Sequence, residues 1–383
     1  MCDAILQNDP SVDKMISGRR LYSLDASRGL LIVHMVMGNS PGNWKFTYPV
    51  LTHLAWNGLS VADVVPAGFL WLMGVCMPFV LQRRLDHVNR SGNIYVYILR
   101  RSAIIFLIGF ALNVVEGLGS PTLWTDIKIL GVLQRIGLSY LIAALLFVTT
   151  GLRGHVVWIF TGQLVYWLIS SFIAVPGFGA GNLSQEGNAA AYIDFLLLGR
   201  HGGNPHSLLS LLTATVTISY GILTGFMLRS VSSGQRRLLL LFLVGAALLS
   251  LGEFAGQWMP INRRLWTPSF VTATAGMLTM LICTFHMFID VLNYRKWAMP
   301  LVVFGLNPLF IFSFSELGRL LTSKKGVTLA DGRWFSLWDY IYRMFFLRLA
   351  SPLNASLLQS TAYAFVFFLL ATAMYRKGLF IKI

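Results

Sequence analysis

The residues best suited to chemistry gather in one stretch near the start of the sequence. His53, Trp56 and Asn57 are spaced i, i+3 and i+4, which would place an imidazole, an indole and an amide on one face of a short helix. Asn39 precedes this group and Asp63 follows it. Because histidine titrates near neutral pH, His53 beside hydrogen-bonding partners has the chemistry to take a proton from an amine or a hydroxyl. The stretch is therefore a candidate acid–base site.

The same residue types also fit structural roles. His53 fits an interfacial histidine with a solvated ring. Ser60 and Asp63 have the spacing of a capping box at the start of a helix, although a capping carboxylate can also orient a nearby imidazole. The spacing alone leaves the structural and the catalytic interpretation open.

The composition is that of a membrane protein. Of the 383 residues, 56% are hydrophobic and 12% are charged, whereas about a quarter of the residues in a soluble domain are charged. The apolar residues form blocks of about 20, the length that crosses a hydrocarbon layer of ~30 Å as a helix. The sequence therefore predicts an all-α, polytopic transmembrane helix bundle and excludes a soluble enzyme.

Apolar blocks between charged residues predict about ten spans, at roughly 29–44, 59–81, 98–115, 129–149, 156–175, 208–228, 238–254, 268–290, 298–318 and 355–375. Two long connections, 176–207 and 319–354, are expected on the outer side. The second is rich in tryptophan and tyrosine and reads as one interfacial helix.

The charge pattern indicates topology. The net charge is +15, and most of the basic residues lie in short loops on the side that also holds both termini. This excess predicts an N-in/C-in orientation and makes a nucleic-acid partner unnecessary. Residues 1–20 are expected to form a cytoplasmic tail without a cleaved signal peptide, and 21–383 a single transmembrane domain. Three dispersed cysteines predict no disulfide framework and no metal site.

Ionisable groups inside apolar blocks need a partner or a function. Arg135, next to Gln134, either binds a phosphate or carboxylate or pairs with Glu116 or Glu253.

Three further sets of residues have two possible interpretations each. Arg263 and Arg264 fit a snorkelling basic girdle or an anion site. His286 and Asp290 fit a proton relay or an interhelical hydrogen bond. Asn307 precedes a proline that breaks the ninth span. The backbone carbonyl that loses its helical hydrogen bond there either lines a cavity or only accompanies a kink in the helix.

A series of motifs occurs in the order known from one family. The sequence resembles the heparan-α-glucosaminide N-acetyltransferase family of transmembrane acyltransferases in Ser23–Gly29, Asn39 with Gly42, His53–Pro66, Gly131–Gly137, Ala191–Asp194, Pro260–Trp266, Gly305–Asn307 and Tyr375–Ile383. The resemblance runs from residue 20 to the end, and several of its motifs are long.

The resemblance implies an enzyme that takes acetyl from cytosolic acetyl-CoA and passes it across the lipid bilayer to a glucosamine amine. It assigns His53 as the catalytic histidine, either a general base or a transient acetyl carrier, with Asn39 and Asp63 in the same site. Asn39 is expected to donate to the thioester carbonyl oxygen. The implied acetyl-CoA-binding residues are Arg135, Gln134, Lys128, Arg263, Arg264, Trp56, Asn57 and Asn307, with Arg101 as a further cation if the cofactor enters from inside. A homodimer is compatible with this reading.

The sequence departs from the family pattern in one loop. It has Asn204-Pro205-His206-Ser207 where the family typically has Asp-Pro-Glu-Gly, so a sugar hydroxyl becomes an alternative acceptor to the amine. The luminal N-terminal part of the animal enzyme is also missing from this sequence, which favours a bacterial cytoplasmic membrane. A proton-coupled secondary transporter of a sugar or carboxylate stays the competing reading, with coupling residues Asp63, Glu253, His286 and Asp290.

Overall fold

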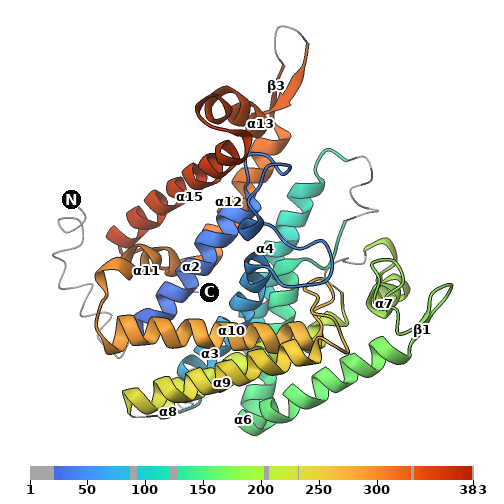
Figure 1. The fold of residues 1–383 in the computed structure, drawn as a ribbon, viewed down its shortest axis with the longest axis vertical. Helices are drawn as coiled ribbons and strands as arrows, with labels where there is room; N and C mark the ends of the chain where they lie inside the picture. Colours follow the sequence, from blue (N-terminus) through green and yellow to red (C-terminus); the bar gives the residue numbers. More distant parts are fainter. Residues whose placement is uncertain are drawn as a thin grey trace.

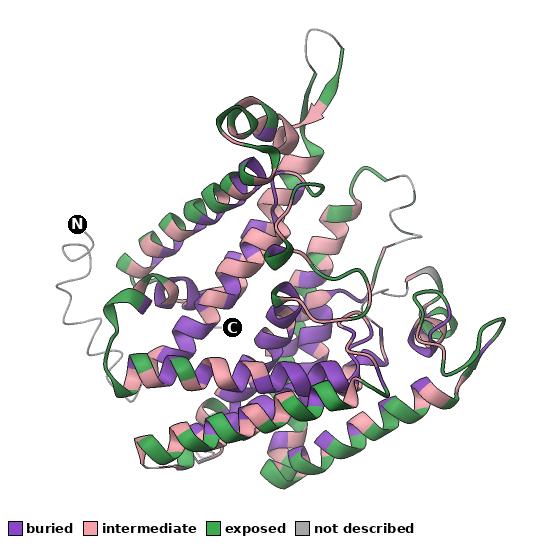
Figure 2. Ribbon diagram, viewed as in Figure 1, coloured by how far each residue is buried: buried purple, intermediate pink, exposed green. Residues whose placement is uncertain are grey.

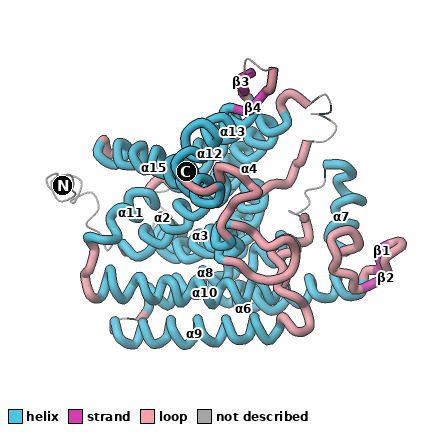
Figure 3. The backbone as a smooth tube through the Cα atoms, turned by 45° about the horizontal axis from the view of Figure 1, so that its top comes forward, coloured by secondary structure: helices cyan, strands magenta, loops and turns pink. Residues whose placement is uncertain are grey.

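The computed structural model describes residues 21–381 except 87–92, 121, 123, 125–126, 202–206, 232 and 329–331. The predicted tail 1–20 and positions 204–206 of the departing loop lie outside these described residues. Most of the described chain is helical, and its only strands form two short hairpins at the margins (Figure 3). The all-α prediction is confirmed.

The helices follow one another along the chain with few long connections (Figure 1). Their bounds are α2 Tyr22–Asn39, α3 Val61–Asp86, α4 Ile94–Gly117, α6 Val132–Phe172, α7 Ala189–Leu198, α8 Ser210–Ser230, α9 Gly234–Ala255, α10 Pro268–Phe285, α11 Met299–Gly305, α12 Pro308–Lys324, α13 Leu337–Ile341, α14 Leu347–Leu349 and α15 Pro352–Arg376. The hairpins pair β1 Ala174–Val175 with β2 Gly179–Ala180 and β3 Gly326–Thr328 with β4 Trp334–Ser336. Local signals set several helix starts: a proline opens α10, α12 and α15, and Asn188 caps α7.

Seven helices are long and apolar enough to cross a membrane, or up to eight if the bent pair α11 and α12 forms one span. This count is lower than the ten or so spans predicted. The expected spans 129–149 and 156–175 correspond to two helices, one on either side of a non-helical conformation at Gly151, which are counted together as the 41-residue segment α6. The expected span 29–44 corresponds to α2, which carries Asp25 and Arg28 and is not among the seven.

The core lies between α3, α8 and α10, where buried residues concentrate, whereas α9 and the far half of α6 expose most of their side chains (Figure 2). Glycines allow α3 and α8 to touch backbone to backbone. A Cβ added at Gly221 would lie 2.0 Å from the carbonyl oxygen of Trp71, and one at Gly74 would lie 2.1 Å from that of Ile218. Close approach through small residues is the usual way in which helices pack inside a membrane.

The two long connections are structured. Residues 176–207 contain the β1–β2 turn and α7. The predicted helix over 319–354 covers only part of that range: the chain there finishes α12, forms the β3–β4 hairpin and is then helical from 337 to 349 through α13, a π-helical turn and α14. Of the aromatic residues, Trp334 lies in the hairpin, whereas Trp338, Tyr340 and Tyr342 lie on this helix.

Candidate active site

An elongated cavity of about 710 Å³ follows one face of α3. The α3 residues that line it recur at helical spacing: Ala62, Val65, Pro66, Phe69, Leu72, Met73, Cys76, Val80 and Arg84. From residue 62 to residue 84 the helix rises ~33 Å at ~1.5 Å per residue, comparable to the ~30 Å of a bilayer core. The cavity therefore extends over about the thickness of a membrane.

Four other helices complete the wall. They contribute Ile32, His34, Met35 and Asn39 from α2, Tyr97, Arg101 and Ile105 from α4, Val132, Leu133, Arg135 and Ile136 from α6, and Pro308, Leu309, Phe310 and Phe312 from α12. Five arginines line the cavity, Arg28, Arg84, Arg101, Arg135 and Arg263, and no aspartate or glutamate is among the described lining residues. The cavity therefore has the charge to hold an anionic ligand.

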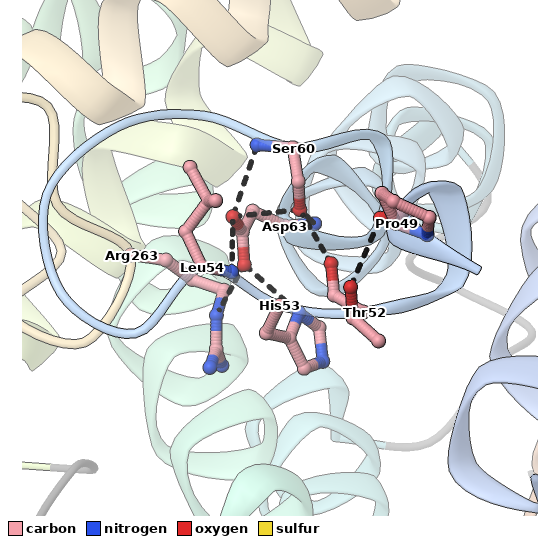
Figure 4. Close-up of polar contacts among 7 residues, drawn as sticks. All are labelled: Pro49, Thr52, His53, Leu54, Ser60, Asp63 and Arg263. Carbon is pink, nitrogen blue, oxygen red and sulfur yellow. Dashed lines mark hydrogen bonds and ion pairs between the residues drawn. The ribbon is translucent and has the colours of Figure 1, made fainter. Parts of the chain in front are cut away.

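His53 lies at one end of the cavity, in contact with Asp63 (Figure 4). The imidazole Nδ1 is 2.8 Å from Oδ1 of Asp63, which is 1% exposed at the start of α3. The other carboxylate oxygen accepts from the backbone N–H and the hydroxyl of Ser60, at 3.0 and 2.8 Å. The Asp63 N–H in turn donates to the Ser60 hydroxyl at 3.2 Å. Asp63 thus caps the helix and also orients the imidazole.

The contacts of Asp63 fix which nitrogen of His53 carries a proton. Arg263 forms an ion pair with Oδ1 of Asp63 at 2.7 Å, so cationic and neutral donors converge on an ionised carboxylate. An ionised acceptor requires a proton on Nδ1 of His53, which leaves Nε2 free to accept one. With 38% of its side chain exposed, His53 is accessible to a reactant in the cavity.

The segment 52–60 is a loop and not the short helix that the spacing predicts. Gly58 has a φ of 110°, which favours glycine and interrupts a helix. The three side chains expected on one helical face bind separate partners in this loop. His53 contacts Asp63, the indole of Trp56 donates to the carbonyl of Leu183 at 2.9 Å, and the side-chain oxygen of Asn57 accepts from the amide of Asn262 at 3.0 Å. Trp56 and Asn57 therefore hold the loop, and neither lines the cavity.

The Asn57 contact joins this loop to the α9–α10 connection, which supplies Arg263. Asn262 is buried, accepts from the N–H of Leu265 at 2.9 Å, and lies next to Ile261, whose carbonyl accepts from the Gly58 N–H at 2.8 Å. Burial lowers the pKa of the Arg263 guanidinium, and the neighbouring Asp63 opposes that shift. Two loops about 200 residues apart in sequence thus form one rigid end of the cavity.

The other predicted ligands divide into two groups. Asn39, Arg135, Arg263 and Asn307 line the cavity together with His53, whereas Gln134, Lys128 and Arg264 do not. The Gln134 side chain packs against α4 beside Gly109. Asn307 also anchors the end of the chain, because its amide donates to the Leu379 carbonyl and its oxygen accepts from the Ile381 N–H, at 3.1 and 2.8 Å.

The far end of the cavity holds residues that the sequence reading did not place in a site. The Arg84 guanidinium lies 3.9 Å from the centroid of the Tyr97 ring, and Arg101 donates to the Tyr97 hydroxyl at 3.5 Å. Between the two ends, Arg28 donates to Sγ of Cys76 at 3.2 Å. Residues 76, 80 and 84 continue the helical spacing of Ala62 and Pro66, and this spacing would have placed Cys76 and Arg84 on the same face of the helix as those two residues.

The four transporter residues do not form one site. His286 binds Asp290 at 2.9 Å within the helical turn that follows α10, and its other nitrogen contacts Arg237 of α9 at 3.1 Å, so the interhelical bond is the one with Arg237. Neither His286 nor Asp290 lines the cavity, nor does Glu253.

Comparison with known proteins shows which family this sequence is similar to. Residues 20–193 match the family model described as heparan-alpha-glucosaminide N-acetyltransferase, catalytic. Over these residues the chain is similar to this family. The mouse heparan-alpha-glucosaminide N-acetyltransferase is 26% identical over 361 residues, 79% of this chain and 54% of the mouse protein. The human protein of that name is 26% identical over 364 residues, 78% of this chain and 53% of the human protein.

The chain thus spans about half the length of the curated relatives that it matches. The match to the acetyltransferase family model includes Asn39, His53, Asp63 and Arg135, whereas Arg263 lies beyond it. The candidate spans are those of a multi-pass membrane protein, and residues 20–193 of it match the catalytic model of the heparan-alpha-glucosaminide N-acetyltransferase family.

Proposed function

We propose that the chain transfers acetyl from acetyl-CoA, bound in the cavity, to a sugar at the end where His53 lies. The observation that carries this proposal is the cavity itself: it is as long as a bilayer is thick, its described lining includes five arginines but no carboxylate, and it has an oriented histidine at one end. Acetyl-CoA is long and anionic at one end and carries its thioester at the other. Its shape and charge therefore match those of the cavity.

The positions of the arginines suggest which part of acetyl-CoA binds at each end of the cavity. Arg84 and Arg101 with Tyr97 bind the CoA phosphates, since guanidinium groups suit phosphate oxygens. The apolar α3 face between Phe69 and Val80 accommodates the pantetheine arm. This arrangement places the thioester near His53 and the nucleotide at the end that the predicted N-in/C-in topology assigns to the cytosol.

The chemistry follows from the His53–Asp63 pair. As the acceptor amine or hydroxyl attacks the thioester carbon, Nε2 of His53 takes its proton, and the carboxylate of Asp63 stabilises the imidazolium through Nδ1. His53 then returns the proton to the departing CoA sulfur. In the covalent variant of the mechanism, His53 first accepts the acetyl group itself and then gives it to the sugar. Asn39, which lines the same end, donates to the acetyl carbonyl oxygen.

The acceptor is a glycan carrying a glucosamine amine or a reactive hydroxyl. Asn204, Pro205 and His206 stand where the family pattern has two carboxylates, which favours a neutral hydroxyl over an ammonium. The expected setting is a bacterial cytoplasmic membrane, and a homodimer remains an expectation from the resemblance.

The transporter alternative has less support. A coupled transporter needs its ionisable residues in the substrate pathway, whereas Glu253, His286 and Asp290 lie outside the cavity lining.

The test is acetyl transfer by the purified protein in lipid nanodiscs. Labelled acetyl-CoA is supplied with glucosamine-terminated and neutral glycans, and His53→Ala is compared with His201→Ala, a histidine outside the cavity lining. We expect transfer by the wild type and by His201→Ala, and none by His53→Ala. Near wild-type transfer by His53→Ala would remove this histidine from the mechanism, and label retained on His53 after rapid quenching would identify the covalent route.

A further inference from the structure

Arg135 is a buried cation that forms no ion pair with any residue that the structure describes. Its side chain lies on the first turn of α6, is 2% exposed, and lines the cavity. Within the described part of the chain, Nε and Nη1 have no hydrogen-bond acceptor, and neither Glu116 nor Glu253 forms an ion pair with it. The pairing that the sequence left open is therefore not made.

The surroundings of Arg135 are built to hold its guanidinium in place. The group stacks 3.8 Å from the ring centroid of Trp266. Trp266 is fully buried, donates from Nε1 to the hydroxyl of Thr217 at 3.1 Å, and packs edge-on against Phe270 at 5.0 Å. Its φ of 58° lies in the left-handed region, which costs conformational free energy for any residue other than glycine. Strain of this kind accumulates where a side chain must be held for function.

The charges at this end of the cavity do not balance. Arg135 and Arg263 are close enough to repel each other, and Asp63 is the carboxylate that neutralises Arg263. Among the described lining residues at this end, the positive charge of Arg135 is not neutralised, and its side chain is shielded from water. Burying an unpaired charge is costly, so an anionic group is expected to approach Arg135 during the working cycle.

We propose that Arg135 is a catalytic residue that donates to the carbonyl oxygen of the bound acetyl group, an inference that rests on the proposed acetyl transfer. The acceptor oxygen or nitrogen forms its bond to the carbonyl carbon, the carbonyl π pair moves to the oxygen facing Arg135, and the acceptor proton moves to Nε2 of His53. The oxyanion pair then re-forms the carbonyl, the carbon–sulfur bond breaks, and the CoA thiolate takes the proton from His53. Negative charge therefore appears on the oxygen that Arg135 contacts.

A phosphate of CoA is the competing ligand for Arg135. Arg135 stacks on Trp266, which lies three residues along the chain from Arg263, and Arg263 pairs with the Asp63 carboxylate that binds His53; these contacts place Arg135 at the reacting end. Arg84 and Arg101 supply cations at the opposite end of α3. The anion at Arg135 is therefore the one that forms during the reaction.

The test compares Arg135→Gln with Arg153→Gln, an exposed arginine on the same helix that does not line the cavity. We expect Arg135→Gln to lower kcat about 10²- to 10³-fold, with the KM for acetyl-CoA and the Kd for CoA, which has no acetyl carbonyl, within about threefold of wild type. Its Tm should be equal to or above that of the wild type, because the substitution removes an unpaired buried charge. Arg153→Gln should leave all four quantities unchanged.

Several results would overturn the inference. An unchanged kcat, or a weakened Kd for CoA with kcat intact, would make Arg135 a phosphate ligand or a bystander. If Arg135→Gln does not fold, Arg135→Lys is measured in its place, and its kcat should be at least about tenfold below that of the wild type. A kcat of Arg135→Lys equal to that of the wild type would refute a catalytic role. Failure of both variants to fold would also count against it, because it would show that the charge of Arg135 is needed for the fold. A wild type that neither binds CoA nor transfers acetyl would instead refute the proposed function, and this inference with it.

Discussion

Replacing Asp63 by asparagine tests how the site orients its histidine. The carboxylate accepts hydrogen bonds from His53, from the N–H and the hydroxyl of Ser60 and, at 3.4 Å, from the Leu54 N–H, and it forms an ion pair with Arg263. An asparagine side chain has one oxygen and one NH₂ group, so at least one of these donors would face another donor. Nδ1 of His53 would lose its anionic partner, and the proton would no longer be confined to that nitrogen.

The expected effect on catalysis is large. General acid–base catalysis contributes about 10²- to 10⁴-fold to a rate, so Asp63→Asn should lower kcat on the order of 10³-fold, or ~4 kcal/mol in activation free energy. Asp290→Asn is the matched control, because that carboxylate also binds a histidine, His286, but lies outside the cavity lining. Asp290→Asn should keep kcat within about threefold of wild type.

Stability provides a second, independent measurement. Breaking a buried ion pair costs ~3–5 kcal/mol when one charge is left behind, and the free energy of unfolding should fall toward the lower figure because Arg263 also faces the cavity. Adding Arg263→Gln should recover at least ~1 kcal/mol relative to the sum of the single variants, without restoring kcat. A kcat for Asp63→Asn above about one-tenth of the wild-type value would refute the orientation argument. Strictly additive stability changes would refute the ion pair.

Two further predictions concern the far end of the cavity and the outer connection. Arg84→Ala and Arg101→Ala should each raise the KM for acetyl-CoA about tenfold with kcat unchanged, and steady-state kinetics showing the loss in kcat alone would contradict the placement of the phosphates. Burial raises the pKa of Asp194, which is 3% exposed, from 3.8 to about 6, so the folded state disfavours its charge. The free energy of unfolding should therefore be highest below about pH 4, and this one carboxyl should lower it by at most ~3 kcal/mol as the pH rises to about 6. Thermal unfolding of wild type and Asp194→Asn at pH 4 and pH 7 measures this, and an equal pH dependence of both proteins would contradict it.

Local sequence rules predicted the parts of the site that are close in the chain. The capping geometry of Ser60 and Asp63 spans one helical turn, and both readings of Asp63 hold, since the carboxylate caps α3 and also binds His53. The helix expected over His53 to Asn57 was wrong because each side chain is bound by a different distant segment. Periodicity records which residues share a face only when the segment is helical.

The long-range part of the site could not be read from the pattern. The ion pair of Arg263 with Asp63 joins the α9–α10 connection to the first turn of α3, 200 residues away in the sequence. The stacking of Arg135 on Trp266 depends on a left-handed backbone conformation that no propensity predicts for tryptophan. The two apolar blocks on either side of Gly151 were predicted correctly as separate helices. The expected span over 29–44 differs, because α2 carries charged residues and is not among the helices that are apolar enough to cross a membrane.

The excess positive charge beside His53 has two consequences for the proposed reaction. It disfavours a protonated amine, so an acceptor reaches the thioester as a neutral hydroxyl or as an amine that has already lost its extra proton. It also stabilises the oxyanion that forms once that neutral nucleophile attacks, where Arg135 is shielded from water and its electrostatic effect is correspondingly strong. Because Asp63 neutralises one guanidinium and orients the histidine at once, the remaining unpaired cation and the free Nε2 face the same reactant. Proton removal and charge stabilisation are therefore supplied from the same end of the cavity by residues that a bilayer-spanning fold brings together from α3, α6 and two loops.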